Sequence, residues 1–349
     1  MPSRTLRRLS SAADLLRPST FFRTLARVDQ VADRTRDLAA AVEGLQIRTE
    51  QLLTIYQSDL EHREDLERLH ELLDPVRIGG HVACAVAAAT LHTNPFPHVI
   101  VEKWLPPDVY RTIVGALPAA VFFADRENRR QQLPVPFPLA PAFSQAVWRF
   151  VAQKIVGGVL SGALNQKFRA AVSDYMRTCC PALPANAGLD LHPSDGRVLL
   201  RRPGYVIEPH RDPKWGFVTG LIYLARNGDN EAYGTQLYRV RGDAEAPSGK
   251  PFYVPQEQCE LVKAVPFRPN TLLAFLNSTG AHGASIPADA EPTLERYVYQ
   301  FRLGPDSRRI TQLLAMMPED RRALWAGAKT ERAYAPNARA AFSQARPDS

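Results

Sequence analysis

The chain has 349 residues, of which 45% are hydrophobic and 23% are charged, and its formal net charge is +7. This composition is ordinary for a globular protein, so it excludes global disorder and the collagen-like and disulfide-scaffold classes, and the length allows more than one structural unit. The charge is unevenly distributed. Residues 1–27 contain six Arg and one Asp, residues 28–75 contain five basic and twelve acidic residues, and the remainder contains 32 basic and 23 acidic residues. Such a split argues against one continuous nucleic-acid-binding face, so no nucleic-acid partner is expected.

The amino-terminal segment, residues 1–27, is predicted to be a basic, flexible leader. It is rich in Arg and Ser and poor in acidic residues. That is also the composition of an organellar transit peptide, but it is common in solvated tails, and this second interpretation is favoured. No apolar run reaches the ~20 residues of a bilayer-spanning helix, so no transmembrane segment is expected. The four Cys lack metal-site spacing and two are vicinal, Cys179 and Cys180, which predicts small buried groups in a reducing, cytoplasmic compartment.

A long helix is predicted over residues 28–75. Its apolar residues recur at steps of three and four, which is the spacing of a coiled-coil seam: Val28, Val31, Leu38, Val42, Leu45, Leu52 and Tyr56. The register slips near Leu60, and Asp74 followed by Pro75 ends the helix. Two interpretations stay open: self-association through residues 28–73, which makes the protein a homo-oligomer, and packing of the stripe against the rest of the chain.

The body of the chain, residues 94–304, is predicted to be one domain. Residues 108–180 provide helical support, interrupted by an irregular Pro-rich loop at 133–141. Short β-branched or aromatic runs separated by Gly, Pro, Asn and Asp then predict a sandwich or barrel, with strands at 198–200, 205–207, 217–224, 235–240, 261–265, 271–276 and 297–303. The expected fold is therefore a mainly β core with flanking helices, preceded by the long helix. In residues 305–349, a helix at 310–325 and then a loose tail are expected.

Candidate metal ligands lie within the strand-rich half. His210 and Asp212 are two residues apart, so on an extended segment both side chains leave the same face while Arg211 points away. Two imidazoles and one carboxylate form the ligand set of non-haem ferrous sites. His282 directly follows another apolar run and is the candidate third ligand. Arg296 begins the next strand and offers a fork suited to a carboxylate.

These segments resemble the Fe(II)/2-oxoglutarate-dependent dioxygenases, in particular the prolyl-4-hydroxylase-like branch. The resemblance covers about residues 198–304, with residues 94–117 similar to the Pro-rich segment and helix that often precede this core. Thr235 replaces the second glycine of a Gly-Gly-x-Leu turn. The interval from His282 to Arg296 is longer than in many members, which makes Arg302 the alternative basic residue.

The resemblance implies a double-stranded β-helix, or jelly roll, in which His210, Asp212 and His282 bind Fe(II). It further implies that Arg296 and Tyr223 hold 2-oxoglutarate as cosubstrate, with O2 as the oxidant and ascorbate as an accessory reductant. The implied reaction hydroxylates an unactivated C–H bond of a protein side chain, lipid, sugar or small metabolite and yields succinate and CO2. Because Asp212 is present, the related halogenases, which lack that carboxylate, are disfavoured.

Two rival functions remain open from the sequence: a non-catalytic jelly-roll scaffold oligomerised by its coiled coil, and a nucleic-acid dealkylase, for which no recognition element is evident. The substrate is expected to be set by loops, here residues 226–233 and the longer 241–258, the latter a candidate lid. Lys214 and Trp215 are candidates for the substrate mouth, and His92 and His98 are expected to be structural. A solvated face is favoured over an anionic-substrate contact for three arginines, Arg126, Arg129 and Arg130. The excess positive charge of the body as a whole is explained better by an anionic cosubstrate than by nucleic-acid binding, and an anionic substrate is a further candidate.

Overall fold

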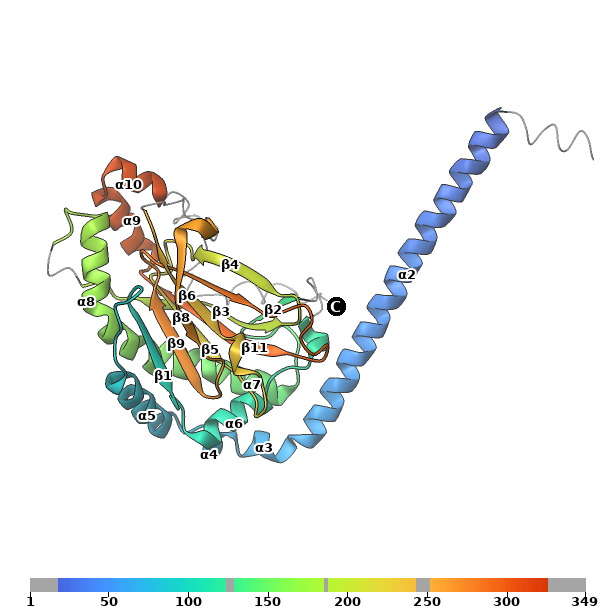
Figure 1. The fold of residues 1–349 in the computed structure, drawn as a ribbon. Coiled ribbons are helices and arrows are strands. Elements are labelled where there is room, and N and C mark those ends of the chain that lie inside the picture. Colours follow the sequence, from blue (N-terminus) through green and yellow to red (C-terminus); the bar gives the residue numbers. More distant parts are fainter. Residues whose placement is uncertain (1–17, 124–128, 185–187, 243–251, 326–349) are drawn as a thin grey trace, which may run out of the picture. The chain divides into compact units, whose positions relative to one another are not determined.

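The structure is a computed structural model that describes residues 18–123, 129–184, 188–242 and 252–325 (Figure 1). The chain divides into two compact units, Met1–Tyr56 and Gln57–Ser349. The described part of the first unit belongs to helix α2 (Pro18–Glu61). Among the described residues, no helix combines the length and the hydropathy needed to cross a membrane.

Helix α2 begins at Pro18, ahead of the predicted start at residue 28, and ends at Glu61, close to where the heptad register slips. The predicted apolar stripe is exposed in this single chain: Val28 is 58% exposed, Leu38 67% and Leu45 68%. The long helix is thus confirmed, whereas the coiled coil and the homo-oligomer stay predictions. Residues 1–17 of the predicted leader, and residues 326–349 of the predicted loose tail, lie outside the described residues.

Helices of the second unit precede and interrupt its strands. Asp74 caps helix α5, where its side chain accepts a hydrogen bond from the Val76 backbone N–H at 2.8 Å and Pro75 occupies the first helical position. The helical stretch predicted to end at residue 180 is present as α7, a π-helical segment η2 and α8. The helices are α3 (Arg63–Glu67), α4 (Leu69–Leu72), α5 (Pro75–Ala88), α6 (Pro107–Gly115), α7 (Ala142–Phe150), η2 (Val151–Leu160) and α8 (Ser161–Cys179).

Two antiparallel sheets form the core, which fits the expected jelly roll. The larger sheet has the order β1-β9-β5-β11-β3-β2, and the smaller has the order β7-β4-β10-β6-β8. The seven predicted strands are all present: β3 (His192–Arg201), β4 (Val206–Arg211), β5 (Val218–Tyr223), β6 (Thr235–Val240), β8 (Cys259–Val265), β9 (Thr271–Leu276) and β11 (Arg296–Gly304). Four further strands were not predicted: β1 (His98–Glu102), β2 (Arg130–Pro134), β7 (Phe252–Tyr253) and β10 (Ala281–Ser285).

Strand β2 corrects the expectation of an irregular loop from residue 133 onward. Leu133 and Pro134 continue a strand that pairs with β3 only, at the edge of the larger sheet. An edge strand tolerates proline because one of its sides carries no ladder hydrogen bonds. The predicted helix at 310–325 is likewise divided into α9 (Ser307–Met316) and α10 (Glu319–Leu324), since Pro318 separates them.

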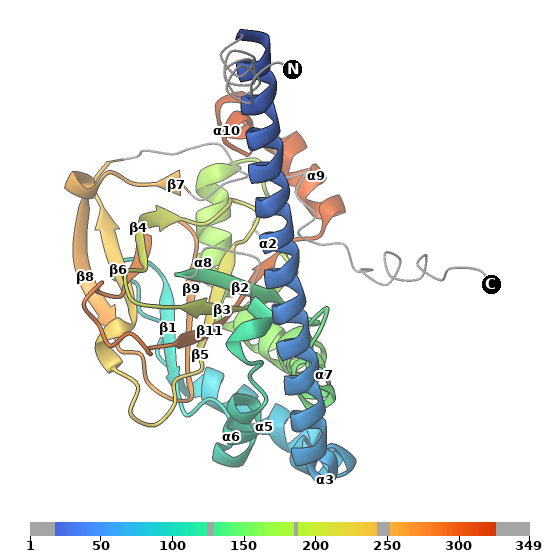
Figure 2. The ribbon, with the colours of Figure 1, turned by 90° about the vertical axis from the view of Figure 1, so that its right-hand side faces the viewer.

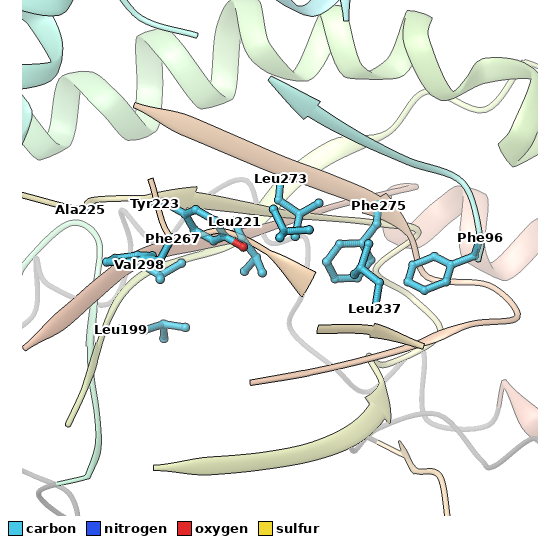
Figure 3. Close-up of a cluster of buried hydrophobic side chains, with 11 residues drawn as sticks. Phe96, Leu199, Leu221, Tyr223, Ala225, Leu237, Phe267, Leu273, Phe275 and Val298 are labelled. Atoms are coloured by element: carbon cyan, nitrogen blue, oxygen red, sulfur yellow. The ribbon is translucent and has the colours of Figure 1, made fainter. Parts of the chain in front are cut away.

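The hydrophobic core lies between the two sheets, which Figure 2 shows side by side. The larger sheet contributes side chains from four strands, including Tyr223 and Phe275, and the smaller contributes Leu237 and Val265 (Figure 3). Contacts of α5 with β1, of α8 with β9 and of η2 with β3 place the helices against the larger sheet. The helices thus cover the larger sheet, and side chains of both sheets form the core between them.

Candidate metal centre and basic cavity

His210 and His282 face each other across two neighbouring strands of the smaller sheet. The antiparallel pairing of β4 and β10 sets them in direct register, and their ring centroids lie 4.2 Å apart. Nδ1 of His210 is 2.9 Å from the Glu208 backbone oxygen, which directs Nε2 toward Asp212. The chain is tight at this point, because a Cβ on Gly283 would meet the Ile207 carbonyl oxygen at 2.9 Å. Small residues after His282 thus allow the two strands to approach.

Asp212 follows the last residue of β4 and completes the cluster. Its carboxylate oxygens are 4.0 Å from Nε2 of His210 and 3.9 Å from Nε2 of His282. One ligand atom from each residue can be chosen so that all three lie within 4.8 Å of one another. Metal–ligand bonds are about 2 Å long, so two ligand atoms bound to opposite sides of one ion lie about 4 Å apart, close to the separations found here. All three residues are buried, and among the described residues this is the one such group that could hold a metal ion.

Arg211, which lies between His210 and Asp212 in the sequence, points away from Asp212, as the alternation along an extended segment predicts. Its guanidinium donates to the backbone oxygens of Thr279 at 2.7 Å and Gly280 at 3.2 Å. Asn277 donates to the backbone oxygen of Asp212 at 2.6 Å. These bonds tie the end of β4 to the turn that precedes His282, so the segments that carry the three candidate ligands are held together.

Charge and burial give the three residues the protonation states of metal ligands. Burial lowers the pKa of His282 to about 3, with a further contribution from His210, whose own pKa burial also lowers. Burial opposes ionisation of Asp212, but Arg302 and the two histidines together hold its pKa well below the usual value. At neutral pH the cluster therefore presents two neutral imidazoles and one carboxylate, which is the form that binds a divalent metal.

Two side chains of the larger sheet hold the Asp212 carboxylate from the opposite side. Thr219 on β5 donates to one oxygen at 2.6 Å, and Arg302 on β11 donates to the other at 2.8 Å. Arg302, the alternative anchor for 2-oxoglutarate, thus already has a carboxylate partner. Its guanidinium also lies 5.3 Å from the ring centre of Trp215. Trp215 is buried, and neither it nor Lys214 is among the described residues that line the cavity beside the cluster.

Arg296 lies on the same face of β11 as Arg302 but forms no ion pair with a described carboxylate. It is 6% exposed, and its guanidinium carbon is 4.8 Å from the Phe267 ring centre and 5.7 Å from that of Tyr223. In the part of the chain that the structure describes, no group forms a hydrogen bond with its Nε. Burial lowers its pKa. Tyr223 is fully buried beside it, and burial raises the pKa of its hydroxyl. A buried cation without a counter-ion is costly, so an anion would be bound strongly here.

A cavity of about 230 Å³ joins the cluster to these arginines. His210, Asp212 and His282 lie on its wall, and Thr235, at the position of the substituted glycine, lines it too. Five of the residues that line it are arginines: Arg130, Arg197, Arg201, Arg296 and Arg302.

The solvated-face interpretation is wrong for Arg130, which is half-buried and lines the cavity, whereas Arg129 is exposed. Arg126 lies outside the described residues. The described lining includes no residue of the 226–233 loop, and residues 243–251 of the candidate lid lie outside the described residues. Arg197 and Arg201 were missed by sequence reasoning.

The other expectations for individual residues hold. His98 is fully buried, with Nδ1 2.8 Å from the Phe96 carbonyl oxygen, and it stacks on His92. Cys179 and Cys180 are buried and form no disulfide bond with a described residue. These residues serve packing rather than the cluster, as the sequence predicted.

No protein-family model matches the chain, and no curated protein matches it. Solved structures of iron- and 2-oxoglutarate-dependent oxygenases, prolyl 4-hydroxylases among them, do match. A prolyl-4-hydroxylase from Pseudomonas putida is 13% identical over 64% of this chain and 99% of its own, with a TM-score of 0.34. The epimerase SnoN, solved with Fe3+, alpha ketoglutarate and nogalamycin RO, is 14% identical over 66% and 84%, with a TM-score of 0.38. HygX from Streptomyces hygroscopicus, solved with nickel, 2-oxoglutarate and hygromycin B, is 16% identical over 60% and 82%, with a TM-score of 0.33. Likeness this low transfers no activity, so function has to be inferred from the residues of this chain.

Proposed function

We propose that the protein is an Fe(II)- and 2-oxoglutarate-dependent dioxygenase that hydroxylates an unactivated C–H bond. The observation that carries this proposal is the convergence, in one cavity, of a buried two-histidine, one-carboxylate cluster and a buried arginine that has no counter-ion among the described residues. Two histidines and one carboxylate suit non-haem Fe(II) and leave coordination positions open. The separate buried cation suits the far carboxylate of a dicarboxylate that chelates the metal at its other end.

Each residue has a defined part in this proposal. His210, His282 and Asp212 hold the metal, and Thr219 and Arg302 fix the orientation of the Asp212 carboxylate. Arg296 binds the distal carboxylate of 2-oxoglutarate, and Tyr223 packs beside it. When bound, iron and 2-oxoglutarate would activate O2 for the oxidation, and 2-oxoglutarate would be converted to succinate and CO2. The surrounding sheets exclude water from the reacting groups.

Turnover of 2-oxoglutarate without an added substrate tests the proposal. The full-length protein is mixed with ferrous iron, ascorbate and 2-oxoglutarate, and succinate is measured. We expect slow succinate formation that His210→Ala abolishes and that His70→Ala, in an exposed histidine of α4, leaves unchanged. Nickel binding measured by calorimetry tests the metal site without turnover. If wild type binds no metal and forms no succinate, and His210→Ala gives the same result in both measurements, the proposed enzymatic function is refuted and the non-catalytic scaffold is favoured.

A further inference from the structure

We infer that residues 28–56 of helix α2 form a parallel, two-stranded coiled coil with a second copy of this chain. The inference goes beyond the proposed function, because it concerns the first compact unit and does not depend on the chemistry of the cavity. It commits the exposed apolar stripe of α2 to one partner, one stoichiometry and one orientation.

The stripe has the extent and the exposure of an interface. Its first and fourth heptad positions, here called the seam, follow one side of α2, which is continuous through this stretch (Figure 1). The seam covers four heptads from Val28 to Tyr56, and about three to four heptads distinguish a coiled coil from a chance pattern. None of its nine residues is charged, and all nine are exposed in the single chain. Most of the stability of a helix comes from packing of its apolar face, so a partner is expected on the seam.

The side chains of the seam favour two helices. The first position of each of the four heptads is β-branched, and the fourth position is Leu in three of them. The first positions are Val28, Thr35, Val42 and Thr49, and the fourth positions are Val31, Leu38, Leu45 and Leu52. In parallel coiled coils, β-branched residues at the first position with Leu at the fourth favour two strands, whereas Leu at the first with Ile at the fourth favours larger bundles. The seam therefore specifies a dimer.

The two threonines can be buried in the seam at little cost. Thr35 Oγ1 donates to the Val31 backbone oxygen at 2.8 Å, and Thr49 Oγ1 donates to the Leu45 backbone oxygen at 2.9 Å. Burial of a hydroxyl is costly when it has no hydrogen bond. Because both hydroxyls are bonded within their own helix, the partner helix does not have to provide an acceptor for either.

The charges beside the seam favour the parallel orientation. Arg34 and Arg48 each directly precede a first-position residue. In a parallel pair they face Ala39 and Leu53 of the other helix, where the arginine stems can lie on apolar side chains with the guanidinium groups in water. In an antiparallel pair with the seams overlapping fully, Arg34 of each copy would face Arg48 of the other. Such like-charge contacts are unfavourable.

The seam ends where the second unit begins. Asp59 occupies the next heptad position, and its carboxylate accepts a hydrogen bond from the backbone N–H of Ala142, the first residue of α7, at 2.8 Å. His62 stacks on Phe143 with the ring centroids 4.5 Å apart. All four residues belong to the second unit. The last turn of α2 is thus bound within its own chain, and both copies of the second unit follow the same end of the parallel coil.

The mass of the full-length protein in solution tests the stoichiometry. Sedimentation equilibrium should give twice the mass of the 38.8-kDa chain. Leu38→Glu removes two leucines from one layer of the seam and places two like charges there, so it should raise the dissociation constant of the dimer by about 100-fold. The matched control is Ala40→Glu, at an exposed position outside the seam, which adds the same charge and should leave the constant within about twofold.

Disulfide formation between the two copies tests the orientation. The background is Cys84→Ser, which removes an exposed native thiol. Val31→Cys should give a covalent dimer on mild oxidation, because in a parallel pair residue 31 faces its own copy. In the fully overlapping antiparallel pair the two residues would be about 27 Å apart, beyond the Cα separation of about 7 Å that a disulfide allows. Gln30→Cys, exposed and outside the seam, should not cross-link.

Each result bears on the inference directly. A monomeric or trimeric wild type overturns it, as does a dimer that Leu38→Glu leaves intact. A dimer in which Val31→Cys cross-links no faster than Gln30→Cys overturns the parallel orientation. The cross-linking variants add no charge to the seam, so they decide the question even if Leu38→Glu does not fold. None of these measurements involves metal or 2-oxoglutarate, so the coiled coil and the proposed function stand or fall separately.

Discussion

Substitution of Arg296 by Met distinguishes the cosubstrate anchor from the metal ligands. The Arg296 guanidinium is buried and makes no ion pair with a described residue. Removing one partner of a buried charge pair costs about 2–5 kcal/mol of binding free energy. We therefore expect Arg296→Met to raise the dissociation constant of 2-oxoglutarate by about 100-fold, which corresponds to about 3 kcal/mol. Met fills a comparable volume without charge, so the metal-free variant should be at least as stable as wild type, since it no longer buries an unpaired cation.

Arg302→Met provides the comparison, because Arg302 binds Asp212 rather than an open part of the cavity. Loss of a hydrogen bond to a metal ligand lowers metal affinity by about 10- to 100-fold. Nickel is titrated first and 2-oxoglutarate second, so that the two constants are measured separately for each variant. Arg296→Met should alter the second constant alone, and Arg302→Met chiefly the first. Near-normal 2-oxoglutarate binding by Arg296→Met, together with its loss in Arg302→Met at saturating nickel, would refute the assignment and make Arg302 the anchor.

Three further predictions follow from buried polar contacts. Thr219→Val removes the 2.6 Å bond to Asp212 and should weaken nickel binding about tenfold in calorimetry, with unchanged unfolding cooperativity. Asp212→Asn removes the buried carboxylate that Arg302 binds and should lower the free energy of unfolding by about 3 kcal/mol in urea. A loss below about 0.5 kcal/mol would contradict a stabilising ion pair between the two residues. Burial lowers the pKa of His98 below its ordinary value of 6.5, so at pH values below 6.5 the unfolded chain binds more protons than the folded chain and the free energy of unfolding falls as the pH drops. His98→Gln should reduce this dependence of the free energy of unfolding on pH by up to about 1.4 kcal/mol per pH unit between about pH 6.5 and 5. An equal pH dependence in the variant and in wild type would exclude a buried neutral imidazole.

Local patterns in the sequence predicted most of the sheet but not the strand that carries His282. The seven predicted strands consist of β-branched and aromatic runs bounded by turn residues. β10 reads Ala-His-Gly-Ala-Ser and has no β-branched or large apolar residue. It is a strand because β4 and β6 pair with it on both sides. His282 was found instead from its order relative to its neighbours, and its register opposite His210 could not be read from sequence.

The arginines of β2 and β3 that line the cavity show the same limit. Arg130 lies in a charged segment that locally resembles a solvated face, and Arg197 and Arg201 flank an apolar run of β3. Alternation along a strand predicts that Arg197, Leu199 and Arg201 share one face, but not that this face lines a cavity. Pairing of β3 with β2 and β11 decides that, and it depends on residues more than 60 positions apart.

The two sheets contribute opposite halves of the site, and Asp212 connects them. The smaller sheet presents two imidazoles that burial keeps neutral, and the larger presents the cations. Asp212 lies on the connection from β4 to β5, beside the two imidazoles, and its carboxylate accepts hydrogen bonds from Thr219 and Arg302 of the larger sheet. Arg302 therefore serves the metal cluster through Asp212, whereas Arg296 on the same strand forms no ion pair with a described carboxylate. In the proposed function this difference gives the two arginines separate parts, because the distal carboxylate of 2-oxoglutarate supplies the counter-ion that Arg296 lacks among the described residues.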